Sequence, residues 1–134
     1  MIVGVDPGER RVGIAVADLE TRFARPLEVI DTKVVDPVVR IVEIVNELDA
    51  TKVVVGRPTD LKGRAGLAVQ KQQVLVEALI GACEVEIVEH DERLTSVIAD
   101  RALRAAGRSA KDARAFRDAV AAQVLLQDYL DSNP

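Results

Sequence analysis

The chain has 134 residues, of which 49% are hydrophobic and 30% charged, a balance that excludes an intrinsically disordered chain and allows one compact domain over residues 1–134. Its single cysteine, Cys83, excludes a disulfide framework or a cysteine-based zinc site within one chain, and its formal net charge of −4, taken alone, argues against a nucleic-acid partner. Because no apolar run approaches the ~18 residues of a membrane span and no basic leader precedes the first strand-like segment, we expect a soluble cytoplasmic protein.

The first three predicted elements are short strands. IVGVD (2–6) alternates as a central strand does, and PGERR (7–11) has the composition of a turn. VGIAVAD (12–18) follows as a second strand, with branched side chains on one face and Gly or Ala on the other. Because the turn between them is so short, these two strands must be antiparallel neighbours. PLEVID (26–31) then completes a predicted meander.

Helices and strands alternate along the rest of the chain. Asp36 can cap a helix and Pro37 can occupy its first position, and the following apolar residues have helical spacing: Val38, Ile41, Val42, Val45 and Leu48. KVVVG (52–56) is a β-branched run of the kind buried in parallel sheets. The remaining predicted elements are a helix over 67–81, a strand over 84–92, a helix from Thr95 or Ser96 to Ala106, and a helix from Ala113 to Leu130.

This order of elements predicts an α/β fold. Three antiparallel strands followed by alternating helices and strands indicate a mixed five-stranded sheet, in which the later strands are parallel additions and helices flank the sheet.

Three acidic positions are candidates for chemistry. Asp6 ends a strand whose other residues are apolar or Gly, where a carboxylate is unfavourable unless it is paired, metal-bound or used to start the turn at Pro7. Asp91 and Glu92 close a later strand, and they could equally be an ordinary polar strand end. Asp118 completes the set on the last predicted helix.

Asp118 shares its helix face with Ala121, Ala122 and Leu125, the face that should pack inward. A carboxylate there needs a partner, and Arg114, four residues earlier, is the alternative to a functional role.

Carboxylates from two strands and a helix can hold one or two Mg²⁺ or Mn²⁺ ions through oxygen ligands. Two such ions about 3.5–4 Å apart can activate a water and stabilise the leaving oxygen of a phosphodiester. His90, the single histidine, is interpreted as a hydrogen-bonding residue at a strand end rather than as a catalytic base.

Residues 93–117 form a basic segment on an otherwise acidic chain. They hold two acidic residues and seven basic ones, which are Arg93, Arg101, Arg104, Arg108, Lys111, Arg114 and Arg117. Three of these arginines, at 101, 104 and 108, share one helix face, which is either a solvated face or a track for phosphates. We therefore expect this segment to bind nucleic acid.

Four motifs resemble those of the YqgF/RuvX family of pre-16S rRNA nucleases and Holliday junction resolvase-like proteins. In chain order they are GVDPGERRVGIAVAD, VVVGRPTDLKGRAG, HDERLTS and RDAVAAQVLLQDYL, and together they cover essentially the whole chain. The resemblance implies an RNase H-like fold and a metal-dependent cytoplasmic endonuclease that matures the 5′ end of 16S rRNA. It places a catalytic, metal-binding triad on Asp6, Glu92 and Asp118, with Asp91 as the fallback for the second acid, and it places Arg11 and Arg93 near a phosphate.

Three other functions compete with this one. Cleavage of branched DNA uses the same chemistry on another substrate. Actin-like ATPases and sugar kinases share the opening motif, but they duplicate the unit over far longer chains. A non-catalytic nucleic-acid-binding or scaffold domain would have no use for three buried acids, which cost stability. The oligomeric state stays open between a monomer and a homodimer.

Overall fold

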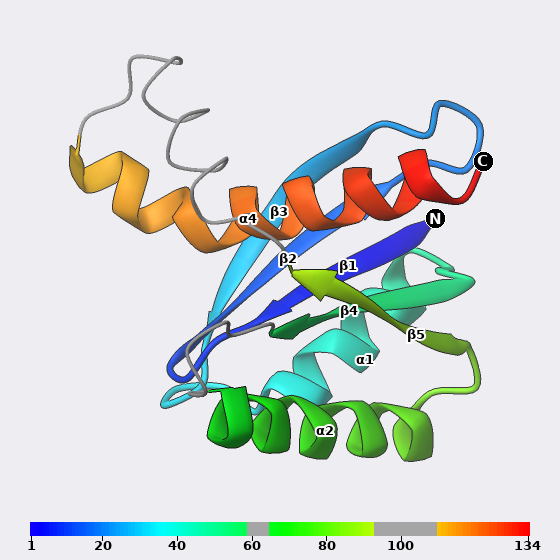
Figure 1. Cartoon of the computed structure of the whole chain (residues 1–134). Helices are drawn as coiled ribbons and strands as arrows, with labels where there is room; N and C mark the ends of the chain where they lie inside the picture. Colours follow the sequence, from blue (N-terminus) through cyan, green and yellow to red (C-terminus); the bar gives the residue numbers. More distant parts are fainter. Residues whose placement is uncertain (59–64, 93–109) are drawn as a thin grey trace.

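The computed structural model describes residues 1–58, 65–92 and 110–134, and it gives only the backbone of residues 65 and 110–115. Five strands and three helices lie within these described residues (Figure 1). In chain order they are β1 (Ile2–Pro7), β2 (Arg11–Ala17), β3 (Ala24–Asp31), α1 (Pro37–Glu47), β4 (Lys52–Pro58), α2 (Ala65–Ala82), β5 (Glu86–Glu92) and α4 (Ala110–Ser132). The helix predicted from Thr95 or Ser96 to Ala106 lies outside the described residues.

The five strands form one mixed sheet in the order β3-β2-β1-β4-β5. β1 pairs with β2, and β2 with β3, in antiparallel fashion, whereas β4 lies parallel to both β1 and β5. The predicted α/β fold, with an antiparallel meander followed by parallel additions, is therefore confirmed. The carboxyl ends of β1, β4 and β5 lie at the same edge of the sheet, because these three strands run in the same direction.

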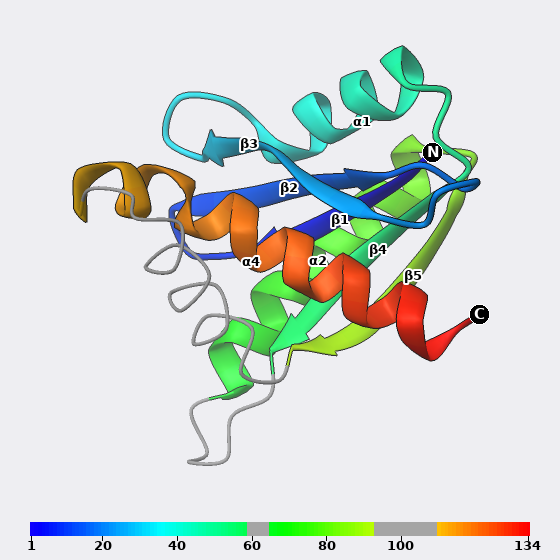
Figure 2. The same ribbon diagram turned by 90° about the horizontal axis from the view of Figure 1, so that it is seen from above.

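Helices cover both faces of the sheet. α1 and α2 lie on one face and α4 crosses the other (Figures 1 and 2). Successive residues of β2 point to opposite faces of the sheet. The side chains of Val12, Ile14 and Val16 point toward α1 and α2 and join the core there. Ala15 and Ala17 join the core beneath α4. These small residues let α4 approach the sheet closely.

Local signals set most of the boundaries. Asp36 caps α1, because its carboxylate accepts a 2.9 Å hydrogen bond from the backbone N–H of Val38. The last helix begins at Ala110, three residues before the predicted start, since Ala and Lys at its first two positions are strong helix formers. β5 begins at Glu86 rather than at residue 84. None of the described helices is both long and apolar enough to cross a membrane.

Candidate active site

Asp6 lies between two glycines in the sheet. It pairs directly with Gly13 of β2. On its other side the parallel ladder of β1 and β4 ends with Val5 paired to Val55, and Asp6 and Gly56 are the next residues of the two strands. Directly opposed residues point to the same face of a sheet. The carboxylate of Asp6 therefore has neighbours without side chains on both sides, and this leaves room above them for groups from other elements.

The space above Gly13 is filled by the backbone of α4. A Cβ atom built on Gly13 would collide with the carbonyl group of Asp118 and would also touch the backbone nitrogen of Ala119. Only glycine therefore permits this crossing. The close approach places Asp118 above the strand residue that pairs with Asp6, on the α4 side of the sheet.

The space above Gly56 is filled by Glu92 from the end of β5. A Cβ atom on Gly56 would lie 2.7 Å from both Cγ and Oε1 of Glu92, and 2.8 Å from Leu125 of α4. The carboxylate of Glu92 therefore lies on the same face of the sheet as Asp6 and Asp118. In this way β1, β5 and α4 bring the three predicted acids to one end of one face.

Asp91 points to the opposite face. Successive strand residues alternate between faces, so Asp91 lies on the side of Glu89, whose carboxylate accepts hydrogen bonds of 2.8 Å from Gln72 and Gln73 of α2. His90 shares the α4 side with Glu92, and its Nε2 lies 2.7 Å from Oδ2 of Asp128. The ring of His90 also packs edge-on against Tyr129. These contacts fit the interpretation of His90 as a hydrogen-bonding strand-end residue.

Burial raises the pKa of two of the three acids. Removal from water raises the pKa of Glu92 to about 7. Burial also raises the pKa of Asp118, and the positive charges of Arg11 and Arg117 partly oppose this rise. Arg11 is two residues from Gly13 on β2, and so it belongs to the same face as the acids. A cation at this place would favour the ionised form of both carboxylates.

The three acids suit a hard divalent cation by their chemistry, and they lie on one face of the sheet. Carboxylate oxygens are the ligands that Mg²⁺ and Mn²⁺ prefer. The two glycines let Glu92 and the backbone of α4 at Asp118 come close to the sheet beside Asp6. Within the part of the chain that the structure describes, no group of three or more Asp, Glu, His or Cys side chains is arranged so that it could hold a metal ion. Binding would therefore require these side chains to turn toward one another.

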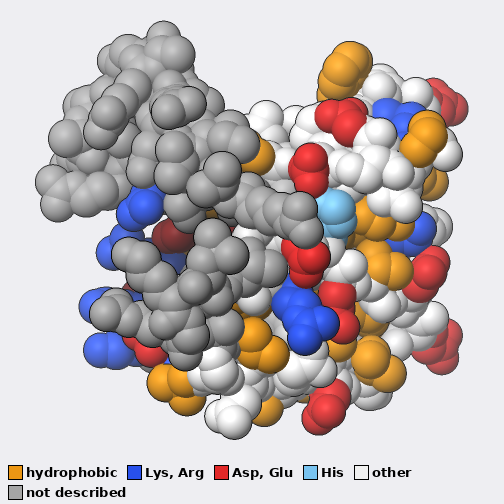
Figure 3. All heavy atoms as spheres, in the orientation of Figure 1, with side chains coloured by type: hydrophobic (Ala, Val, Ile, Leu, Met, Phe, Trp, Pro, Cys, Tyr) orange, Lys and Arg blue, Asp and Glu red, His pale blue; other side chains and the backbone are white. Residues whose placement is uncertain are grey.

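The predicted nucleic-acid-binding residues are placed only in part. Arg11 and Arg117 are exposed and lie near Asp118. Figure 3 shows Lys and Arg side chains along the left edge of the molecule, the end of the sheet at which β1 finishes. Four of the predicted arginines, Arg93, Arg101, Arg104 and Arg108, lie outside the described residues. Lys111 and Arg114 lie on α4, where the structure describes only the backbone.

The chain is similar to known proteins along nearly its whole length. The model of the RuvX family, described as Holliday junction resolvase, matches residues 1–132. The chain belongs to this family. A Chloroflexus aurantiacus protein named "Putative pre-16S rRNA nuclease" is 38% identical over 138 residues, covering 100% of this chain and 90% of the relative. A Fusobacterium nucleatum protein of the same name is 40% identical, covering 96% of this chain and 95% of the relative.

Solved structures show that this RuvX-family chain has the RNase H-like fold of the resolvases. T. thermophilus RuvC in complex with a Holliday junction substrate superposes with a TM-score of 0.59 at 19% identity, covering 98% of this chain and 93% of that one. The fowlpox virus resolvase, in complex with Holliday junction DNA, superposes with a TM-score of 0.58 at 10% identity, covering 98% and 97% of the two chains.

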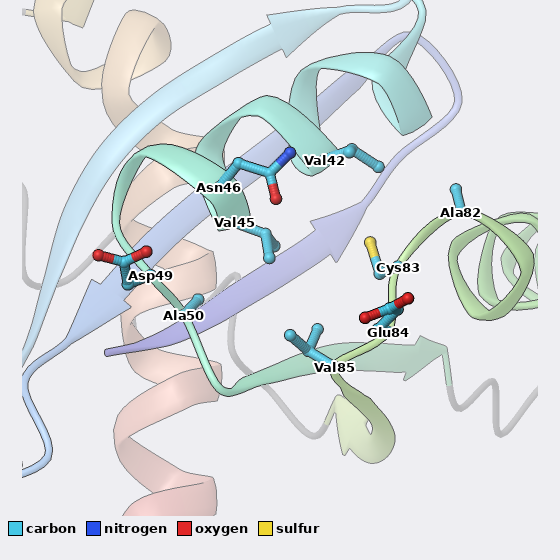
Figure 4. Close-up of a pocket in the computed structure, with 9 residues that line it drawn as sticks. All are labelled: Val42, Val45, Asn46, Asp49, Ala50, Ala82, Cys83, Glu84 and Val85. Carbon is cyan, nitrogen blue, oxygen red and sulfur yellow. The ribbon is translucent and has the colours of Figure 1, made fainter.

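A cavity of about 500 Å³ lies at the opposite end of the sheet from the acids. It opens where the chain leaves α1 and α2 to enter β4 and β5, and Figure 4 shows Cys83 with Val45 and Val85 at its wall. Burial raises the pKa of the Cys83 thiol, which is free and only half-buried. This cavity is therefore separate from the acidic groups that could carry chemistry in this RuvX-family chain.

Sequence reasoning missed the contribution of the two glycines beside Asp6. Glycine inside a strand marks a close approach of another backbone or ligand; Gly13 interrupts a run of branched residues, and Gly56 ends one. That signal was present in the sequence. The sequence did not show which group approaches each glycine, because that depends on how α4 and β5 pack on the sheet.

Proposed function

We propose that this chain is a metal-dependent endonuclease that hydrolyses phosphodiester bonds in the precursor of 16S rRNA. The observation that carries the proposal is the gathering of Asp6, Glu92 and Asp118 on one face of the sheet, with glycines on both sides of Asp6. Membership of the RuvX family and the names of the curated relatives support the same reading. A cytoplasmic location would follow, because precursor rRNA is processed there.

In this proposal Asp6, Glu92 and Asp118 hold Mg²⁺ or Mn²⁺. Such an ion, when bound, activates a water molecule and stabilises the leaving oxygen of the phosphodiester. Glu92 would give up its proton at neutral pH on becoming a ligand, because a positive charge beside it would lower its pKa from about 7. Asp91, on the other face, is the less suitable second acid.

Arginines on the same side of the sheet would hold the nucleic acid. Arg11 and Arg117 are exposed and close enough to Asp118 to influence its pKa. A phosphate bound by these guanidinium groups would lie beside the acids, with its charge compensated. Further contacts with the phosphates of the nucleic-acid strand would come from the basic residues at 93, 101, 104, 108, 111 and 114.

Resolution of branched DNA is the second candidate. The family is described as Holliday junction resolvase, and two solved structures with this fold contain Holliday junction DNA. The chemistry at the acids would be the same for RNA and DNA, so only the substrate separates the two functions.

The decisive experiment offers both substrates to the same preparations. A fragment of precursor 16S rRNA and a four-way DNA junction are incubated with wild type, Asp6→Asn and Asp118→Asn, in Mg²⁺, in Mn²⁺ and in EDTA. We expect cleavage of the RNA by wild type with either metal, and its loss in EDTA and in both variants. Asp131→Asn, an exposed acid farther along α4, is the matched control and should cleave normally. If wild type cleaves neither the RNA nor the DNA junction, the proposal that the chain is an enzyme is wrong.

A further inference from the structure

β5 lies at the edge of the described sheet, where β4 is its one neighbour among the described strands (Figure 1). An apolar side chain stands on each of its faces, because Ile87 packs against the core beneath α1 and α2, whereas Val88 packs against the core beneath α4. Hydrophobic burial therefore specifies the register of β5 less sharply than it does in a strand with one apolar face. Because Glu92 ends this strand, other contacts must help to fix the face to which it points.

On the face toward α2, β5 is tied to the helix by Glu89. Its Oε1 accepts hydrogen bonds of 2.8 Å from Nε2 of Gln72 and from Nε2 of Gln73. Gln72 is 1% exposed, and among the described residues it is the one buried polar or charged residue. A buried amide is costly unless it is hydrogen-bonded. A shift of β5 by one residue would turn Glu89 to the opposite face and remove this acceptor from Gln72.

On the face toward α4, β5 is tied to the helix by His90. Its Nε2 donates to Oδ2 of Asp128 over 2.7 Å, since an ionised carboxylate can only accept. The ring of His90 also packs edge-on against Tyr129, with ring centroids 5.7 Å apart. The hydroxyl of Tyr129 accepts a 3.0 Å hydrogen bond from Nζ of Lys52, at the start of β4. The edge strand is therefore connected to α4 and, through Tyr129, to the neighbouring strand.

We propose that Glu89 and His90 are positioning residues that hold Glu92 on the α4 face of the sheet. They are adjacent in the sequence, three and two positions before Glu92. Because adjacent strand residues point to opposite faces, one tether is made on each side of the sheet. A slip of one residue would break both tethers. The proposal rests on the proposed function where it treats the carboxylate of Glu92 as a metal ligand.

The two tethers decide which acid meets Asp6. A slip of one residue would bring Asp91 to the α4 face and carry Glu92 to the α2 face. Outer groups that orient metal ligands typically contribute tenfold to a hundredfold in metal affinity, so loss of either tether should weaken Mn²⁺ binding by about tenfold. Global stability should change little on the α4 side, because the side chain of Asp128 is 63% exposed and exposed pairs contribute little.

The position of Glu92 can be measured without metal. Its Cγ and Cδ2 of Leu125 both lie within 2.8 Å of the point that a Cβ atom on Gly56 would occupy, so the two side chains are neighbours. In NMR spectra of methyl-labelled protein in EDTA, wild type should show a nuclear Overhauser effect between the γ protons of Glu92 and a methyl group of Leu125. The double variant E89A/D128A, checked for folding by circular dichroism, should lose most of this effect. An undiminished effect in the double variant would overturn the proposal.

The affinity for Mn²⁺ tests the consequence at the site. Electron paramagnetic resonance of free Mn²⁺ gives the dissociation constant for wild type and for each variant at neutral pH. Glu89→Ala and Asp128→Ala should each bind about tenfold more weakly. Glu89→Gln and Asp128→Asn keep an acceptor oxygen, and they should bind as wild type does. Asp131→Ala is the matched control and should also bind normally, because Asp131 accepts its hydrogen bond from Gln127 of the same helix.

The outcomes separate this proposal from the proposed function. If wild type binds no Mn²⁺, or if Asp6→Asn binds it equally well, the metal site of the proposed function is wrong. The Overhauser effect then still decides whether Glu89 and His90 hold Glu92 in place. If wild type binds Mn²⁺ and Asp6→Asn does not, but Glu89→Ala and Asp128→Ala bind it as wild type does, the tethers do not position the ligand and only the present proposal fails.

Discussion

Replacing Glu92 by Gln should change how the stability of the metal-free protein depends on pH. The amide keeps the shape of the side chain and removes its charge. Burial raises the pKa of Glu92 from its ordinary value of 4.5 to about 7, so the folded protein holds this proton more tightly than the unfolded chain does. The interval of about 2.5 pH units, at 1.36 kcal/mol per unit, amounts to about 3 kcal/mol.

The sign follows from proton linkage. Below the unfolded pKa both states carry the proton, and Glu92 costs no stability through its charge. As the pH rises from 4.5 to about 7, the unfolded chain loses this proton while the folded protein still holds it, so the free energy of unfolding decreases. Above that range the loss is complete. The Glu92→Gln variant does not titrate at this position and avoids the loss.

Urea unfolding in EDTA, followed by far-ultraviolet circular dichroism between about pH 4 and pH 8, measures the effect. The free energy of unfolding of Glu92→Gln, minus that of wild type, should rise by about 3 kcal/mol across this range. Glu84→Gln is the control, because Glu84 is exposed, and its difference should stay small throughout. A difference for Glu92→Gln that is flat, or that falls with pH, would refute the reasoning from burial.

Three further predictions concern backbone approach, metal binding and capping. Gly13→Ala should lower the free energy of unfolding, measured by urea titration, by about 3 kcal/mol or more, because its methyl group collides with the backbone of Asp118. Gly66→Ala is the control, because Gly66 lies in open space, and it should change the free energy of unfolding by at most about 1 kcal/mol. Mn²⁺ should raise the Tm of wild type in thermal scans at neutral pH but not that of Asp6→Asn, if Asp6 is a ligand. Asp36→Ala should cost about 1 kcal/mol by urea unfolding, because it removes the cap of α1.

Much of the fold could be predicted from local patterns. The short turn after Asp6 forced β1 and β2 to be antiparallel, and the Asp36-Pro37 pair identified the start of α1. The alternation of small and branched residues in β2 predicted one face with branched side chains and one face with small ones, and these faces join two different cores. These features depend on neighbours in the chain, so a single sequence is enough to read them.

The candidate site was predicted residue by residue but not as an arrangement. Asp6 and Asp118, the two ends of the set, are 112 residues apart in the sequence, and no local pattern says which side chains meet. The choice between Asp91 and Glu92 shows this clearly. One residue of shift along a strand exchanges the faces of the sheet, so the choice depends on the register of β5 against β4.

The sequence by itself determined the type and order of the described strands and helices and the candidate acids, because hydrophobic period, capping and turn composition act over a few residues. Tertiary structure alone decided that α4 crosses the sheet over Gly13 and that Glu92 lies over Gly56. Those two contacts come from how the helix and the edge strand pack on the sheet. Burial then raises the pKa of Glu92, since desolvation exists only once the chain has closed around it.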